Sequence, residues 1–132
     1  MTPLIVAIWV AGAVQLAIAA ANLEVARKLD YRANLARLTP IVAQVFLAHA
    51  VYIVLVMIWF SSICLVFARE LASGDPLARF LTGGLAAFWG LRAIIQLTFY
   101  DRQVRKDHRL EDVAFLAACA LLTGIFLTAV LR

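Results

Sequence analysis

Apolar residues fill most of the chain in four long stretches, and short segments between these stretches hold nearly all of the charges. The four stretches cover about residues 3–23, 41–67, 79–100 and 113–131. Each has close to the ~20 residues that an α-helix needs to cross the hydrocarbon core of a bilayer. The pattern predicts an all-α membrane protein in which four transmembrane helices form a single bundle, with one domain over residues 1–132.

The three prolines agree with these boundaries. Pro3, Pro40 and Pro76 each stand at the start of an apolar stretch, directly after a threonine or an aspartate. Proline at the first position of a helix loses no needed hydrogen bond, and Thr and Asp are good capping residues, so these prolines predict helix starts. Asp107 offers a similar cap ahead of the fourth helix. The first helix is expected to continue past the membrane into the long connection 24–40.

Composition agrees with a membrane protein. The chain is 65% hydrophobic and only 15% charged, with a mean hydropathy of +0.95. Soluble domains are nearer ~45–50% apolar. The net charge of +4 does not indicate nucleic-acid binding, because the basic residues are spread over short connections and do not form one basic face. The lipid bilayer is therefore the expected partner of most of the surface.

The basic residues also predict an orientation. The connections 24–40 and 101–112 hold eight Lys and Arg residues, and the remaining connection and the C-terminus hold three. Because basic residues collect in cytoplasmic loops, both of these connections are expected to be cytoplasmic, with both termini on the other side. The location predicted is a bacterial-type inner (plasma) membrane.

Arg92 is the charged residue that lies deepest in a predicted span. Insertion of such a charge into a bilayer costs about 2.5–3.5 kcal/mol, so an arginine at this depth is a candidate functional residue. Trp89, Gln96 and Tyr100 lie on the same helical face. No carboxylate within the spans is expected to neutralise Arg92.

Counting residues from the predicted cytoplasmic ends puts Gln15, His49 and Arg92 at one level, about 12 Å inside the membrane at 1.5 Å per residue. Gln44 and Gln96 form a shallower pair. The second span is expected to turn one face to its neighbours, holding Val45, His49, Tyr52, Val56 and Trp59. The predicted ligand-binding or polar layer comprises Gln15, Gln44, His49, Tyr52, Trp89, Arg92, Gln96 and Tyr100.

Each of these residues also has a structural explanation. The glutamines suit hydrogen bonds between helices. His49 suits a neutral buried hydrogen-bonding group, with a pigment ligand, a haem ligand or a proton carrier as the alternatives. Arg92 is expected either to extend to the headgroups or a carbonyl, or to bind an anionic group of a lipid, a quinone-like molecule or a partner protein.

Small residues predict close helix contacts. Gly83, Ala87 and Gly90 form a stripe on the third span, on the side away from Arg92, and the fourth span carries Ala120 and Gly124 four residues apart. Small residues let helix backbones approach closely in lipid. Contacts with other membrane-protein chains are therefore expected through the third and fourth helices.

Catalytic chemistry is poorly supported. The sequence has no Ser/His/Asp set, no paired carboxylates, no metal-binding cluster and no phosphate-binding glycine loop. We therefore assign no catalytic residue and no metal ligand, and the sequence requires no cofactor. Cys64 and Cys119 lie in apolar stretches at different depths, so we expect free, buried thiols.

Three functions remain as hypotheses. The leading one is a non-catalytic accessory or assembly subunit of a larger membrane complex, for example a respiratory or photosynthetic one. The alternative is a protein that binds a lipid or a quinone-like amphiphile in a polar pocket around Arg92 and His49. A small oligomeric transporter is the third.

Overall fold

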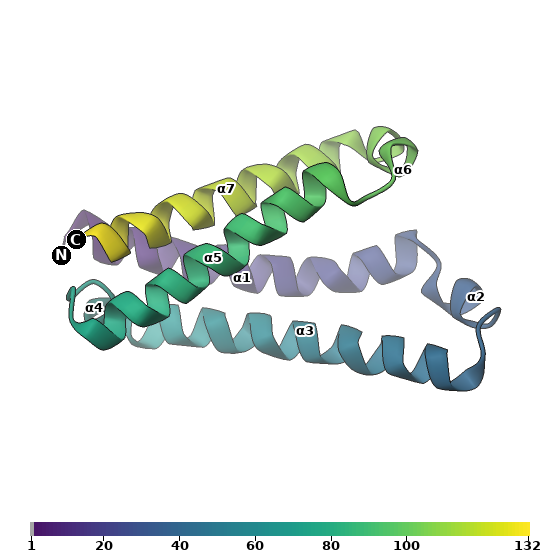
Figure 1. Cartoon of the computed structure of the whole chain (residues 1–132), viewed down its shortest axis with the longest axis horizontal. Helices are drawn as coiled ribbons and strands as arrows, with labels where there is room; N and C mark the ends of the chain where they lie inside the picture. Colours follow the sequence, from purple (N-terminus) through teal and green to yellow (C-terminus); the bar gives the residue numbers. More distant parts are fainter. Residues whose placement is uncertain (1) are drawn as a thin grey trace. The chain divides into compact units, whose positions relative to one another are not determined.

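The computed structural model describes residues 2–132, and the regular secondary structure of this part of the chain is all helical (Figure 1). The long helices are α1 (Pro3–Lys28), α3 (Pro40–Val66), α5 (Pro76–Thr98) and α7 (Arg109–Leu131). Three short helices lie in the connections: α2 (Tyr31–Leu35), α4 (Ala68–Leu71) and α6 (Arg102–Asp107). All four long helices are long and apolar enough to cross a membrane, which confirms the four predicted spans.

The helix starts at the three prolines are confirmed, and the first helix continues past residue 23 as predicted. The Thr2 hydroxyl caps α1 by accepting a hydrogen bond from the backbone N of Ile5 at 3.3 Å. Asp75 stands at the N-cap of α5, but its side chain makes no capping hydrogen bond. The start of α5 therefore rests on proline geometry rather than on a side-chain cap.

The predicted cap at Asp107 is wrong. His108 occupies the N-cap position of α7, and Asp107 is the last residue of α6. Part of the connection folds into α6 because Asp101 caps it, with its Oδ1 accepting from the backbone N of Gln103 at 2.7 Å and of Val104 at 3.2 Å. The fourth long helix can then begin only at Arg109.

The chain divides into two compact units. One consists of Gly12–Val66, and the other consists of the residues up to Ala11 together with Phe67–Arg132. Helix α1 contributes to both units, because the division falls within it.

In the unit Gly12–Val66, α1 and α3 are held at one end by close polar contacts. The Ser61 hydroxyl donates to the backbone oxygen of Gly12 at 2.7 Å, and the Gln15 amide donates to the Sγ of Cys64 at 3.4 Å. A Cβ on Gly12 would lie 2.8 Å from the Cγ of Leu65, so this approach of the two helices requires glycine.

The other end of this unit holds the α1–α3 connection. Asp30 adopts a left-handed backbone conformation with φ of 50°, and the Asn34 amide donates to the backbone oxygens of Leu29 at 2.9 Å and Asp30 at 3.0 Å. The ring of Tyr31 in α2 meets the ring of Phe46 edge to face, with 5.2 Å between their centroids. These contacts fix where α3 begins relative to α1.

In the other unit, α5 and α7 pack against each other as an antiparallel hairpin joined through α6 (Figure 1). A Cβ on Gly83 would lie 3.7 Å from Val130, and one on Gly90 would lie 3.6 Å from Thr123, so both glycines face α7. The side chains that α5 and α7 bury most completely are Thr82, Trp89, Cys119, Leu122, Phe126 and Ala129.

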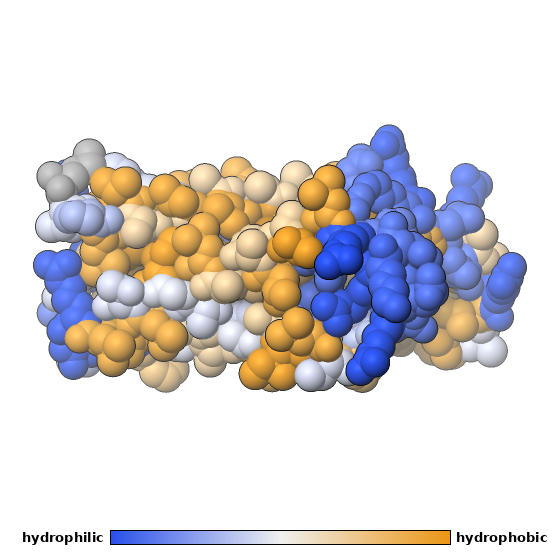
Figure 2. Space-filling view, turned by 90° about the horizontal axis from the view of Figure 1, so that it is seen from above, coloured by the Kyte–Doolittle hydropathy of each residue, from blue (hydrophilic) through white to orange (hydrophobic). Residues whose placement is uncertain are grey.

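The outer surface of α5 and α7 is largely apolar. Figure 2 shows hydrophobic residues along the helices and hydrophilic residues gathered where α6 lies. The exposed apolar side chains include Phe80, Leu91, Ile94, Val113, Leu121 and Leu127. This distribution suits a hairpin surrounded by lipid, with α6 at the level of the headgroups.

Candidate functional site

The candidate site is a polar network at the α6 end of the α5–α7 hairpin, built around Arg92. Arg92 lies six residues before the end of α5 and is half-buried. Its Nη1 donates a hydrogen bond to the Oε1 of Gln96 at 3.2 Å, one helical turn further along. Residues four apart lie on the same helical face, so this contact follows directly from the sequence spacing.

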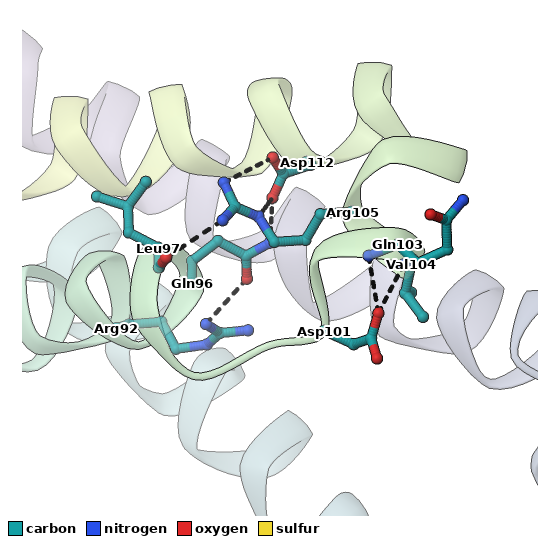
Figure 3. Close-up of polar contacts among 8 residues, drawn as sticks. All are labelled: Arg92, Gln96, Leu97, Asp101, Gln103, Val104, Arg105 and Asp112. Atoms are coloured by element: carbon teal, nitrogen blue, oxygen red, sulfur yellow. Dashed lines mark hydrogen bonds and ion pairs between the residues drawn. The ribbon is translucent and has the colours of Figure 1, made fainter.

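Gln96 connects Arg92 to a carboxylate on the next long helix. Its Nε2 donates to the Oδ1 of Asp112, in the first turn of α7, at 2.6 Å. Arg105 of α6 binds the same carboxylate through both oxygens, with Nε–Oδ1 at 3.1 Å and Nη2–Oδ2 at 3.2 Å. The Nη1 of Arg105 also donates to the backbone oxygen of Leu97 at 3.2 Å. Figure 3 shows how these side chains tie α5, α6 and α7 together.

Two aromatic rings flank the Arg92 guanidinium. Its Cζ lies 5.1 Å from the centroid of the Tyr100 ring and 4.6 Å from that of Phe115. Both distances are within the ~6 Å range of cation–π attraction. Gln96 in the last turn of α5 and Tyr100 just after the helix both follow Arg92 in the chain, so the Arg92 side chain extends toward the α6 end of the helix (Figure 3).

The charges of the network do not cancel. Arg92 and Arg105 bring two positive charges and Asp112 brings one negative charge, and both Asp112 oxygens are bound to Arg105. Within residues 2–132, Arg92 has no ion pair, and its Nε and Nη2 have no hydrogen-bond partner. The network therefore carries one excess positive charge, located at Arg92.

The predicted site residues fall into separate groups. Arg92, Gln96 and Tyr100 are brought together, and Trp89 is buried in the same hairpin with an edge-to-face contact to Phe88 at 5.2 Å. The other four predicted residues belong to the unit Gly12–Val66. Of these, Gln15 is fully buried, whereas the side chains exposed on α3 are Gln44, His49 and Tyr52.

The prediction that Gln15 and His49 lie at one level is wrong. Gln15 lies opposite Cys64, which is 15 residues beyond His49, or about 22 Å along α3 at 1.5 Å per residue. The reason is the register between α1 and α3. Helix α1 continues five residues past residue 23, to Lys28, and the start of α3 lies further along than the end of α1, so residues 23 and 41 do not mark one level.

The predicted inward face of α3 is also wrong. Its buried residues are Met57, Ser61 and Cys64, whereas Tyr52 is 68% exposed and Trp59 is 65% exposed. Nearly every residue of α3 is apolar, so hydropathy does not select one face. Contacts of Ser61 and Cys64 with Gly12 and Gln15 of α1 determine the rotation of the helix instead.

Sequence reasoning missed Arg105, Asp112 and Phe115. The first two belong to the connection 101–112, whose charges were used only to predict the orientation in the membrane. The sequence positions of these residues could have indicated the contact between α5 and α7. An antiparallel hairpin with a short connection brings the last turn of one helix beside the first turn of the next. Gln96 and Asp112 occupy those turns.

The small residues divide between internal and outward positions. Gly83 and Gly90 contact α7 within the same chain, whereas the exposed small residues are Ala87, Ala120 and Gly124. No atom lies within 4 Å of a Cβ built on Gly124. Cys64 and Cys119 are free and buried, as predicted.

Within residues 2–132, no group of three or more His, Cys, Asp or Glu residues lies together as a potential metal site. Four apolar helices of spanning length define a multi-pass membrane protein, and the Arg92 network is its most developed polar site. Comparisons with protein-family models, curated proteins and solved structures found no match to this chain.

Proposed function

We propose that this protein is a non-catalytic accessory or assembly subunit that binds another membrane-protein chain through a face of α3. The observation that carries the proposal is the placement of His49. It lies nine residues after the start of a 27-residue apolar helix, and its side chain is exposed. At 1.5 Å per residue this is about 13 Å from the start of α3, well inside the span.

One ring nitrogen of His49 has a hydrogen-bond partner, and the other has none among residues 2–132. Its Nδ1 lies 2.7 Å from the backbone oxygen of Val45. A carbonyl oxygen only accepts, so Nδ1 carries the proton of this hydrogen bond. Among residues 2–132, Nε2 has no partner. Lipid tails cannot hydrogen-bond, and ionisable groups within spans usually face protein or water.

A partner helix can supply the hydrogen-bond donor for Nε2 that lipid tails lack. The face around His49 also holds Val45, Tyr52 and Val56, which follow helical spacing, and the Tyr52 side chain is 68% exposed beside the imidazole. The partner expected here is an apolar transmembrane helix with one hydrogen-bond donor, such as a serine or asparagine, opposite His49. The exposed pair Ala120 and Gly124 on α7 offers a second position for a close helix contact.

Site-specific photo-crosslinking in the native membrane tests this proposal. Val45 and Leu47 are both 48% exposed but lie on opposite sides of α3, because they are two residues apart. A photo-reactive phenylalanine at position 45 is expected to give one discrete crosslinked product with another chain. The same residue at position 47 is expected to give only lipid adducts.

A substitution then separates a specific contact from adventitious capture. His49→Leu keeps the apolar surface and removes the hydrogen bond, so the crosslink from position 45 is expected to disappear. Leu47→Ala, the matched change on the other side, leaves it intact. Equal crosslinking from both positions, or a crosslink that survives His49→Leu, would overturn the proposal. A pigment or haem that is released by His49→Leu would also overturn it.

We place the protein in a bacterial-type inner membrane, with the connections 24–40 and 101–112 on the cytoplasmic side. The support is the distribution of Lys and Arg residues. This orientation puts α6 and the Arg92 network near the cytoplasmic headgroups, and it puts α4 and both termini on the other side.

A further inference from the structure

We propose that Arg92 binds the phosphate of an anionic phospholipid at the α6 end of the α5–α7 hairpin. This site goes beyond the contact proposed for α3, because it belongs to other helices and takes a different class of ligand. The excess positive charge described above is its starting point. A half-buried cation is normally paired, and Arg92 has no pairing carboxylate within residues 2–132.

The geometry leaves the binding edge of the guanidinium open. Nη1 is bound to Gln96 at 3.2 Å, whereas Nε and Nη2 have no partner among the described residues. This Nε–Nη2 edge is the planar fork that binds two oxygens of a phosphate. The Phe115 and Tyr100 rings, with centroids 4.6 Å and 5.1 Å from Cζ, limit the rotation of the guanidinium and hold the fork in place.

Asp112 does not compete for this fork. Arg105 engages both of its oxygens, and the Gln96 amide lies between it and Arg92. A direct Arg92–Asp112 ion pair would cancel the charge that an anionic ligand needs. The network instead keeps the carboxylate occupied and leaves the positive charge of Arg92 available.

The position of Arg92 along the helix matches a lipid phosphate. α5 has 23 residues and is about 34 Å long at 1.5 Å per residue, slightly more than the ~30 Å hydrocarbon core. Arg92 lies about 9 Å before its end by the same rise, and the side chain extends toward α6 (Figure 3). An arginine that extends from this depth reaches the headgroup level.

Apolar surface beside the network favours a lipid over free phosphate. Leu91, next to Arg92 in α5, is 59% exposed, and Phe99, seven residues after Arg92, is 79% exposed. Val113 of α7, next to Asp112, is 54% exposed. Acyl chains can lie along these side chains while the phosphate meets Arg92. Free phosphate has the same charge chemistry but gains nothing from the apolar surface, so the two sources can be separated by experiment.

The test is lipid retention from nanodiscs that contain equal amounts of phosphatidylglycerol and phosphatidylcholine. Native mass spectrometry of the released protein measures which lipid stays bound. The wild-type protein is expected to retain phosphatidylglycerol preferentially. Arg92→Gln is expected to lower that preference at least about tenfold, the effect of losing a charge-assisted hydrogen-bond pair. Arg109→Gln is the matched control, because Arg109 is exposed near the same end of the hairpin and lies outside the network.

Arg92→Lys keeps the charge without the fork, so it is expected to retain only part of the preference, and it also serves if Arg92→Gln does not fold. Phosphatidylglycerol added in detergent is expected to raise the Tm of the wild-type protein and of Arg109→Gln but not of Arg92→Gln. Millimolar inorganic phosphate is expected to leave every Tm unchanged.

Three results would overturn the proposal. The first is a phosphatidylglycerol preference that Arg92→Gln and Arg92→Lys leave unchanged. The second is an equal loss in Arg109→Gln, which would reflect general surface charge. The third is a Tm increase with inorganic phosphate as large as that with lipid, which would assign the site to free phosphate.

Discussion

Replacement of Asp112 by asparagine tests whether the polar network stabilises the α5–α7 hairpin. The carboxylate accepts three hydrogen bonds, one from Gln96 at 2.6 Å and two from Arg105 at 3.1 and 3.2 Å. Asparagine has nearly the same shape but replaces one oxygen with a donor. At least one N–H group of its partners then faces another N–H group, and the charge of Arg105 is no longer balanced.

The burial of the pair sets the expected magnitude. An exposed ion pair contributes about 0–1 kcal/mol, and breaking a fully buried one costs about 3–5 kcal/mol. The side chains of Arg105 and Asp112 are 23% and 10% exposed, so this pair lies between those limits. We expect Asp112→Asn to lower the free energy of unfolding by about 2 kcal/mol, which is roughly a 30-fold change in the unfolding equilibrium.

The assay is reversible unfolding of the purified protein in mixed detergent micelles, followed by tryptophan fluorescence and circular dichroism. A double-mutant cycle with Arg105→Gln is expected to give a coupling free energy of about 1–2 kcal/mol, because the two residues bind each other directly. Asp107→Asn is the control. It removes the same charge from α6, where Asp107 is exposed and accepts one hydrogen bond from Gln103 at 3.1 Å.

A change of less than about 0.5 kcal/mol for Asp112→Asn, similar to the ordinary scatter of surface substitutions, would refute this reasoning. Additive effects of the two substitutions would refute it as well. Either result would mean that the hairpin is held by its apolar packing alone.

Two further predictions concern packing and orientation. Gly12→Leu is expected to destabilise the protein by at least about 1–3 kcal/mol in the same unfolding assay, because a Cβ at this position already overlaps Leu65. Gly124→Leu is expected to have little effect, because no atom lies within 4 Å of its Cβ position. Equal losses of stability in the two variants would contradict the close approach of α1 to α3. A membrane-impermeant maleimide is expected to label Glu70→Cys in intact spheroplasts and Gln103→Cys only after lysis. The buried Cys64 and Cys119 are expected to give little background labelling. The reverse pattern would invert the proposed orientation.

The sequence predicted the long helices well because two strong signals coincide at their starts. Pro3, Pro40 and Pro76 begin α1, α3 and α5, and each apolar run has the length that a bilayer requires. It did not predict α2, α4 and α6, which have four to six residues each and depend on local contacts. The cap of Asp101 on Gln103 and Val104 is one such contact.

The sequence predicted some of the contacts around Arg92 but not all of them. Arg92 and Gln96 share one helix and Tyr100 directly follows it, so their relation follows closely from helical geometry. Asp112 and Phe115 depend on the register between α5 and α7, which the folding of α6 determines. The predicted level of His49 was wrong for the same reason, because the prediction assumed that the apolar stretches end at the same height in the membrane. Errors in register and in the rotation of α3, not in the assignment of the long helices, therefore account for the misplaced residues.

The Gln96 amide gives the network a fixed direction. Its oxygen accepts from a cation and its nitrogen donates to an anion, so a rotation of the amide by 180° would turn both contacts into repulsions. A carboxylate at this position would repel Asp112, and an ammonium would repel Arg92. Position 96 thus tolerates neither a positive nor a negative side chain. The neutral amide of Gln96 separates the charges of Arg92 and Asp112, which would otherwise neutralise each other.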